Sequence, residues 1–220
     1  MADDTSNAER DLAAGDFASW VTQMQGAIRG DRGSDVPCGG CTACCRSSQF
    51  VHIGPDETDT LAHVPADLLF PAPLRPAGHV VLGYDERGHC PMLIDDACSI
   101  YEHRPRTCRT YDCRIFPASG LELADDDKPA ISRQARRWRF NFPTEAERTR
   151  YQAVQAAAAF LREHPDALPI GSGPASTSVL AGLAVELHAL FLRHDADTDR
   201  TTVVDPDPRL VSNELIRLMS

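Results

Sequence analysis

The sequence predicts a mixed α+β protein, in which a small, loop-rich cysteine-cluster core with short strands is flanked by N-terminal and C-terminal helices. Two observations indicate this fold class. All eight cysteines lie between positions 38 and 113, among short strand-like runs and turn residues, and the long helical patterns lie toward the two ends. We therefore expect residues 1–142 to hold an N-terminal helix and a metal-binding cysteine-cluster domain, and residues 143–220 to form a helical extension.

The composition is that of an ordinary globular protein. Hydrophobic residues make up 42% of the 220 residues and charged residues 25%, which excludes a disordered or fibrous chain. The net charge of −10 argues against nucleic acid or an anionic membrane as a partner. The longest apolar stretch, Val179 to Leu192, is interrupted by Glu186 and His188 and is too short to span a membrane. The acidic N-terminus does not fit a signal peptide, so we expect the protein in the cytoplasm.

The N-terminal third combines one long helix with short elements. Apolar residues at spacings of three to five predict a helix over residues 8–29, and glycines end it. The stretch from Pro37 to Cys45 is small and loop-like, Phe50 to Ile53 is typical of a strand, and a helix is expected over Asp56 to His63.

The next segment is expected to form a hairpin. Prolines make Pro65 to Pro76 irregular. Val80 to Tyr84 and Cys90 to Ile94 are predicted strands that pair across a turn at Asp85 to Gly88, and a second turn follows at Asp95 and Asp96. This arrangement predicts that Cys90 lies beside Val80.

The C-terminal third is predicted to be helical. A capping box of Thr144 and Glu147 begins a helix over residues 144–164. Further helices are expected over residues 176–193 and 208–219, with an acidic linker at residues 195–199 between them.

A basic and aromatic segment precedes these helices. Its arginines could bind a nucleic-acid backbone while its aromatic rings stack on bases, but the same alternation is typical of a strand with one buried face. The negative net charge favours the strand. The segment contains Arg133, Arg136, Arg137, Trp138, Arg139, Phe140 and Phe142.

The cysteines carry the functional signal. Thiols stay reduced in the cytoplasm, where structural disulfides are rare, so clustered cysteines there indicate a metal site. Four disulfides would require export, and a single redox pair would leave six cysteines unexplained. The candidate ligands are Cys38, Cys41, Cys44, Cys45, Cys90, Cys98, Cys108 and Cys113.

The spacing of the cysteines narrows the kinds of centre. Cys38 and Cys41 form a C-x-x-C pair that can chelate one metal from a tight turn. Cys44 and Cys45 are adjacent and their side chains diverge, so they are expected to serve two centres, or two metals of one cluster. Two zinc sites, a shared polynuclear cluster, and one iron–sulfur cluster with four cysteines left over all stay open. The C-x-x-C-x-x-C triplet and the remote Cys90-Pro91 favour iron and sulfur, as in bacterial ferredoxins.

The cysteine pattern resembles a known family. Cys38-x2-Cys41-x2-Cys44-Cys45, Cys90-Pro91 and Cys98-x2-Tyr101-x2-Arg104-Pro105-x2-Cys108-Arg109-x3-Cys113 are similar to the YkgJ-type cysteine-cluster family, a zinc- or iron-chelating domain. The resemblance covers residues 37–115 and implies metal binding through these cysteines. The flagellin lysine methylases carry a similar constellation and are associated with an iron–sulfur cluster and S-adenosylmethionine.

Three functions remain open from the sequence. The first is a metal-binding protein that holds an iron–sulfur cluster or zinc, with iron–sulfur favoured. The second is a metal-dependent modifying enzyme of the methyltransferase kind that acts on a protein or peptide. The third is a structural zinc module that presents the C-terminal helices to a partner. No phosphate loop, dinucleotide fingerprint or serine hydrolase pattern is present in the sequence.

Two arginines are expected beside the metal centre. Four thiolates leave a net charge of −2 on a zinc ion or a [4Fe–4S]²⁺ core, which nearby guanidinium groups can offset. Arg104 and Arg109 flank Cys108 within the family-like pattern and are assigned this role. The other arginines of the segment, Arg46, Arg106 and Arg114, are expected to pair with acids or solvent, and His89 and His103 to be surface residues.

Overall fold

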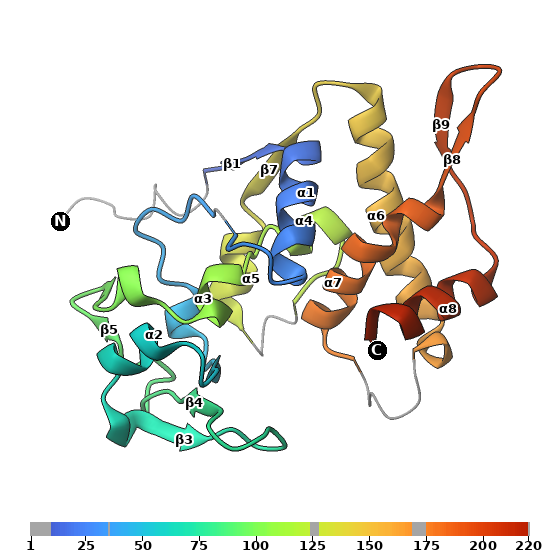
Figure 1. The fold of residues 1–220 in the computed structure, drawn as a ribbon. Helices are drawn as coiled ribbons and strands as arrows, with labels where there is room; N and C mark the ends of the chain where they lie inside the picture. Colours follow the sequence, from blue (N-terminus) through green and yellow to red (C-terminus); the bar gives the residue numbers. More distant parts are fainter. Residues whose placement is uncertain (1–9, 35, 124–127, 169–174, 220) are drawn as a thin grey trace.

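The fold is seen in a computed structural model, which describes residues 10–34, 36–123, 128–168 and 175–219. In these ranges the chain forms eight α-helices and four small sheets, so the predicted mixed α+β class with helices toward both ends is confirmed. Figure 1 shows α1, α4, α6, α7 and α8 gathered on one side of the molecule and the strands β3, β4 and β5 on the other. We call these parts the helical body (residues 12–28 and 113–219) and the small lobe (residues 47–110).

The helical body is built around one apolar core. Phe17 and Trp20 of α1 pack with Val154 of α6 and Val185 of α7, all 2% exposed or less. The Thr144 hydroxyl accepts a hydrogen bond from the Glu147 N–H at 3.2 Å, so the predicted cap of α6 is confirmed. The helices are α1 Phe17–Ile28, α4 Ile115–Ser119, α5 Pro129–Ala135, α6 Glu145–Glu163, α7 Thr177–Leu187 and α8 Pro208–Met219.

The first helix begins later than predicted. Residues 8 and 9 lie outside the described residues, and Leu12–Asp16 form the strand β1, which pairs in parallel with β7 (Trp138–Asn141). Gly15 has a φ of +88°, which an α-helix does not permit. The strand predicted for the basic and aromatic segment is confirmed only over Trp138–Asn141, where Trp138 is 2% exposed, whereas Arg133 lies in the helix α5 and Arg136 caps it. Pairing with a strand so distant in sequence leaves no trace in local periodicity.

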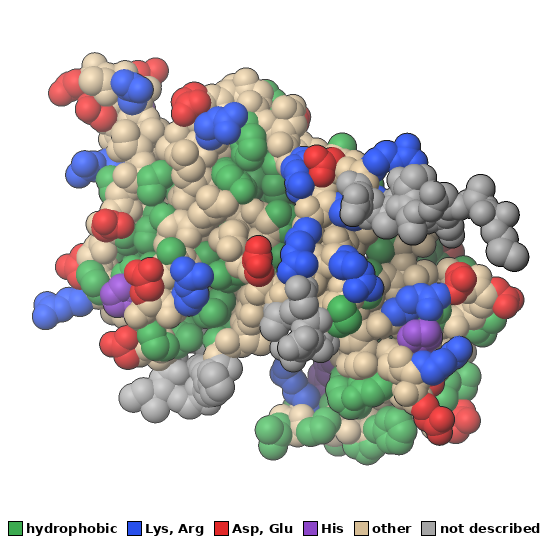
Figure 2. Space-filling model, turned by 180° about the vertical axis from the view of Figure 1, so that it is seen from behind, with side chains coloured by type: hydrophobic (Ala, Val, Ile, Leu, Met, Phe, Trp, Pro, Cys, Tyr) green, Lys and Arg blue, Asp and Glu red, His purple; other side chains and the backbone are tan. Residues whose placement is uncertain are grey.

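The small lobe holds a three-stranded antiparallel sheet in the order β2-β4-β3. Its strands are β2 (Val51–Ile53), β3 (Leu69–Pro71) and β4 (Val80–Leu82), and α2 (Thr58–His63) follows β2. The strands predicted near residues 50 and 80 are confirmed, whereas β3 lies in the stretch predicted to be irregular. The lobe has its own core, and Figure 2 shows hydrophobic side chains gathered where this lobe reaches the lower edge of the molecule.

The predicted hairpin between Val80–Tyr84 and Cys90–Ile94 is wrong. Both edges of β4 pair with β2 and β3, and β5 (Leu93–Ile94) pairs instead with β6 (Ala97–Cys98). The Cys90 N–H donates to the Cys45 carbonyl at 2.7 Å, and Pro91 has no N–H to offer a strand. The turn at Asp95 and Asp96 forms as predicted, with φ of 48° and 59°.

The helix predicted over residues 176–193 forms but ends early, and the predicted acidic linker after it is wrong. α7 ends at Leu187 and is followed by a 3₁₀ turn, η5 (His188–Phe191). The chain then forms a hairpin of β8 (Leu192–Asp195) and β9 (Arg200–Val203), so the acidic residues are its turn.

The division into two domains at residues 142 and 143 stays a prediction. The core of the helical body takes side chains from both sides of this boundary. Among the described helices, none has the length and apolarity to cross a bilayer.

Candidate metal centre

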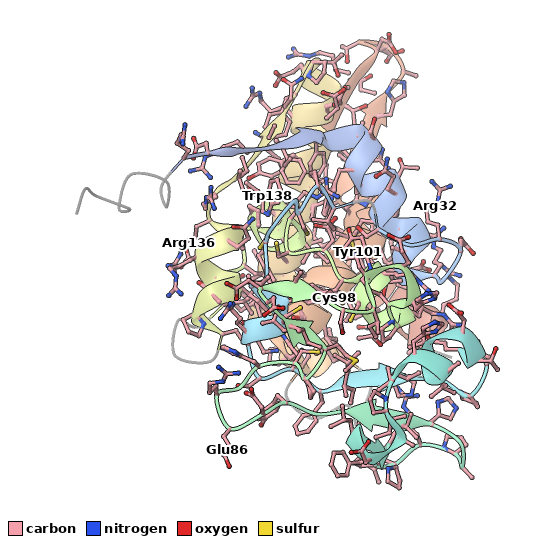
Figure 3. All side chains as sticks on the ribbon, turned by 90° about the vertical axis from the view of Figure 1, so that its left-hand side faces the viewer. Arg32, Glu86, Cys98, Tyr101, Arg136 and Trp138 are labelled. Atoms are coloured by element: carbon pink, nitrogen blue, oxygen red, sulfur yellow. The ribbon has the colours of Figure 1, made fainter. Side chains whose placement is uncertain are left out.

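A cavity of about 380 Å³ is lined by residues between Ser34 and Tyr111, from the small lobe and from the segment that precedes it. Seven of the eight cysteines line it, together with Tyr101, Arg104, Arg109 and Tyr111. The eighth, Cys113, is buried in the core of the helical body. Figure 3 shows Cys98 and Tyr101 near the middle of the molecule, with further sulfur atoms around them. The structure thus gathers the predicted ligands from three separate stretches of the chain.

Local hydrogen bonds hold the cysteine-bearing segments. The Cys41 N–H donates to the Cys38 carbonyl at 2.9 Å and closes the first turn, in which Gly39 has a φ of +54°. Cys44 and Cys45 open the 3₁₀ turn η1 (Cys44–Arg46). Cys98 lies opposite Leu93 in the β5–β6 hairpin.

The last two cysteines depend on α3 (Arg106–Thr110). This helix is attached to the sheet, because the Thr107 hydroxyl donates to the His52 carbonyl at 2.7 Å. The buried Glu57 carboxylate accepts the Arg106 N–H at the beginning of the helix. Cys108 is therefore fixed to the small lobe, and Cys113 lies just beyond the end of the helix.

Three cysteines that line the cavity are coupled electrostatically to the buried Cys113, and we call these four the first quartet. Burial and the ionised forms of Cys113, Cys38 and Cys41 raise the pKa of the Cys44 thiol. Burial also raises the pKa of Cys113 to about 12, with Asp112, Cys38 and Cys41 adding to the effect. Such mutual repulsion requires the groups to lie close together. The first quartet is Cys38, Cys41, Cys44 and Cys113.

The other four cysteines form a second quartet. Burial raises the pKa of Cys108 to about 12, and Cys45, Cys90 and Cys98 contribute repulsion. Burial raises the pKa of Cys45 to about 11, and Cys90 and Cys98 contribute more to this shift than Cys41 of the first quartet does. The second quartet is Cys45, Cys90, Cys98 and Cys108, and its members Cys90 and Cys98 pack against the core of the small lobe.

The sulfur atoms of the quartets are neighbours without being in close contact. All eight cysteines are described, and all are free thiols. No three of their Sγ atoms lie within 4.8 Å of one another. Each quartet is therefore an open set of thiols around the cavity.

The thiols need a cation to ionise. Cys44 and Cys108 are exposed toward the cavity, but the surrounding protein desolvates them and raises the pKa of both. A reactive cysteine nucleophile has a lowered pKa, so these raised values fit metal ligands better than a nucleophile. A bound cation would offset the repulsion among the thiolates.

Two buried polar groups that line the cavity lack a protein partner. The Arg104 guanidinium lies 3.5 Å from the Tyr101 ring centroid, and its Nε has no hydrogen-bond partner among the described residues. The Tyr111 hydroxyl is likewise unpaired within the part of the chain that is described. The Arg104 charge lowers the pKa of Cys38 in the first quartet and of Cys108 in the second, against the larger effect of burial. Arg104 therefore acts on both quartets.

The other arginines of the segment have acidic neighbours. Arg109 lines the cavity, as the sequence suggested, and its Nη2 lies 3.9 Å from the Glu57 carboxylate. The three arginines expected to pair with acids do so: Arg46 with Asp96, Arg106 with Asp56, and Arg114 with Asp112.

The sequence did not reveal the partners of Cys113. The Trp138 indole N–H donates to the Cys113 Sγ at 3.2 Å. The neighbouring Asp112 carboxylate is buried and accepts from the Trp20 indole at 2.9 Å and the Arg114 guanidinium at 2.7 Å. The alternating basic and aromatic pattern predicted a buried face for Trp138, but nothing in the sequence indicated which group that face would meet.

Open sets of thiols around a shared cavity define a cysteine-ligated metal-binding domain. Residues 37–136 match the family model CxxCxxCC, described as "Putative zinc- or iron-chelating domain". The match covers all eight cysteines, confirms the resemblance inferred from the cysteine spacing, and indicates chelation of zinc or iron by this segment. No curated protein and no solved structure matches the chain.

Proposed function

We propose that this domain is an iron–sulfur module with two metal centres, one on each quartet. The observation that carries the proposal is the division of the eight cysteines into two sets of four, with the adjacent Cys44 and Cys45 in different sets. Four thiolates are the full protein ligand set of a [4Fe–4S] cluster or of a tetrahedral zinc ion. Both quartets therefore have enough ligands for a complete centre.

The spacing of the sulfur atoms favours iron–sulfur clusters over single zinc ions. A zinc ion binds each sulfur at about 2.3 Å, so the four sulfurs of a tetrahedral site stand roughly 3.8 Å apart. No set of three among the eight sulfurs is held even within 4.8 Å. A cluster core places several iron atoms between its ligands and suits wider spacing. The ferredoxin-like Cys38, Cys41 and Cys44 triplet supports the same choice.

The lining of the cavity fits an anionic cluster. The unpaired Arg104 Nε and Tyr111 hydroxyl are both donors, and a cluster surrounded by thiolates offers sulfur acceptors and negative charge. Trp138 already donates to a ligand sulfur of the first quartet. When bound, such clusters supply one-electron redox chemistry. The residues of this chain would hold them, shield them from water and offset their charge.

Two measurements test this proposal. Protein purified without oxygen is expected to be brown and to contain iron and acid-labile sulfide, whereas colourless protein with stoichiometric zinc would reject the iron–sulfur assignment. Cys44→Ser and Cys45→Ser are matched variants, because they change neighbouring residues that lie in different quartets. Each is expected to lose about half of the bound metal, since one complete ligand set remains. Complete loss of metal in either single variant would indicate one shared centre instead.

A further inference from the structure

A second group of metal-binding side chains lies on the surface of the small lobe. Asp59 and His63 are one turn apart on α2, and His103 belongs to the 3₁₀ turn η3 (Tyr101–His103). Among the described residues, these three form the group whose possible ligand atoms all lie within 4.8 Å of one another. None of them belongs to the cysteine cavity, so the group requires an explanation of its own.

Backbone contacts fix the relation between the two elements. The Thr60 hydroxyl of α2 donates to the His103 carbonyl at 2.9 Å. Thr60 is 2% exposed, so this contact is buried beneath the exposed side chains of the group. The three candidate ligands therefore lie on a preformed support and need only side-chain adjustment to share an ion.

The distances suit ligands of one small cation. The His103 Nδ1 is 2.8 Å from the Asp59 Oδ2, and the His63 Nδ1 is 3.8 Å from the Asp59 Oδ1. Metal bonds of about 2.0 to 2.1 Å place neighbouring ligand atoms roughly 2.8 to 3.4 Å apart. An ion that replaces the proton between His103 and Asp59 would need an inward movement of His63, whose side chain is 41% exposed and whose Nδ1 would give up its 2.8 Å contact with the Asp59 carbonyl.

The two imidazoles already lie against each other. The rings of His63 and His103 are stacked, with centroids 3.5 Å apart and planes 6° from parallel. The lone pair of an imidazole nitrogen lies in the ring plane, so the two rings would have to tilt toward each other to bind one ion. The Asp59 carboxylate would supply negative charge, because the hydrogen bond from His103 holds the pKa of that carboxyl below its usual range.

We propose that Asp59, His63 and His103 bind a divalent transition-metal ion of the Zn²⁺ type at a site separate from the cysteine quartets. Two imidazoles and one carboxylate are a donor set typical of zinc and its first-row neighbours. Three protein ligands leave a coordination position for water or another small ligand. This proposal stands independently of which metal the cysteines hold.

Zinc binding to the full-length protein, with its cysteine centres loaded as purified, tests this site. Equilibrium dialysis against Zn²⁺ is expected to show one additional ion per chain in the wild type. Asp59→Asn and His63→Gln should weaken its binding by roughly 100-fold or more, because loss of even the supporting partners of metal ligands costs 10- to 100-fold. His79→Gln is the control, since it removes a histidine of the same lobe that pairs with His52 outside the group.

The difference between the wild type and the Asp59→Asn variant is the decisive quantity, because any zinc bound by the cysteines is common to both. Unchanged melting temperatures would show that these exposed substitutions leave the fold intact. No additional ion in the wild type, an additional ion retained in both variants, or an equal loss in His79→Gln would each overturn the proposal. So would a thiolate-to-metal charge-transfer band when Co²⁺ is the additional ion, since the proposed ligands are nitrogen and oxygen only.

Discussion

At the scale of single residues, Trp138 connects the metal-binding cysteines to the helical body. Its indole is buried in the core of the body, and its N–H reaches the sulfur of Cys113. Hydrogen bonds to a ligand sulfur stabilise its negative charge and raise the reduction potential of an iron–sulfur cluster. One residue thus contributes both to packing and to the electrostatics of the first quartet.

Replacing Trp138 with Phe tests this role. Phe keeps an aromatic ring but loses the N–H and the five-membered ring, so we expect a cost of about 0.5 to 1.5 kcal/mol for the hydrogen bond, a further cost for the space left behind, and weaker metal retention at the first quartet. A lower reduction potential of one centre only, measured by redox titration followed by electron paramagnetic resonance, would agree with this assignment. Equal shifts of both centres would contradict it.

Arg104 is expected to act on both centres. Its charge lowers the pKa of a cysteine in each quartet, and its Nε lacks a protein partner among the described residues. Arg104→Gln should therefore weaken metal retention or lower the reduction potential at both quartets. Arg109→Gln should have a smaller effect, because the nearby Glu57 carboxylate already offsets the Arg109 charge.

Arg137→Gln is the control for both substitutions. Arg137 bonds to the Arg10 carbonyl and to Gln134, and it does not line the cavity. The measured quantities are the metal content, the resistance of the bound metal to a chelator, and the reduction potential. If Arg104→Gln and Arg137→Gln behave alike, Arg104 does not stabilise the centres.

At the scale of elements, the short turn η1 explains how adjacent cysteines serve different quartets. A 3₁₀ helix has 3.0 residues per turn, so consecutive side chains point about 120° apart. The electrostatic effect of Cys113, Cys38 and Cys41 on the pKa of Cys44 exceeds that of Cys45, and the effect of Cys90 and Cys98 on the pKa of Cys45 exceeds that of Cys41. The Cys45 carbonyl also accepts the Cys90 N–H, which holds the second quartet together.

The contact between η5 and α6 contains a buried histidine that makes stability depend on pH. His188 is 2% exposed, its Nδ1 lies 2.7 Å from the Val185 carbonyl, and its Nε2 accepts a hydrogen bond from Arg150 at 2.9 Å. Burial, with a smaller contribution from Arg150, lowers the pKa of His188 below 6.5. The unfolded chain therefore takes up this proton more readily than the folded one.

Because the folded protein binds this proton less readily than the unfolded chain, acid lowers the free energy of unfolding. The contribution of a neutral His188 is fully present above a pH of about 6.5 and is lost as the pH falls through 6.5 toward the lowered folded pKa. The wild type should lose more free energy of unfolding between pH 7.5 and 5.5 than His188→Gln, in which this proton site is absent. Urea titrations at the two pH values measure the difference, and identical losses would contradict the linkage.

At the scale of the whole molecule, two apolar cores of unequal size meet across the metal cavity. The helical body has an extensive core of its own, whereas the core of the small lobe rests on six buried residues, Val51, Ile53, Val64, Leu82, Met92 and Ile100. Structural metal sites contribute about 10 to 16 kcal/mol in small zinc peptides, which is comparable to the stability of a whole domain. The small lobe should therefore depend on metal far more than the body does.

Metal removal is expected to loosen one part of the molecule and leave the other folded. Amide protection, measured by hydrogen exchange and mass spectrometry, should fall across residues 37–113 after chelation and persist in α6 and α7. The body acts as an internal control, because both parts belong to one chain. Unchanged protection of the cysteine segments in verified metal-free protein would show that the lobe folds without metal.

The existence of the long helices, and some of their ends, were predictable because these signals are local. The capping box at Thr144, the C-terminal helix over Pro208–Met219 and the turn at Asp95 and Asp96 depend on residues close together in sequence. The errors involve distant partners. β1 pairs with β7, and Cys90 donates its N–H to the Cys45 carbonyl and does not pair with β4.

The sequence by itself predicted the pool of candidate ligands and the divergence of Cys44 and Cys45, because residue types and short spacings limit what a thiol can bind. Only the tertiary structure decided that Cys113 completes the first quartet, that Cys108 completes the second, and that Trp138 contacts a ligand sulfur. It also brought His103 to Asp59 and His63. The physical reason is that these contacts join segments that are far apart in the sequence. Such segments meet only when the two apolar cores pack, and the spacing of neighbouring residues does not specify that packing.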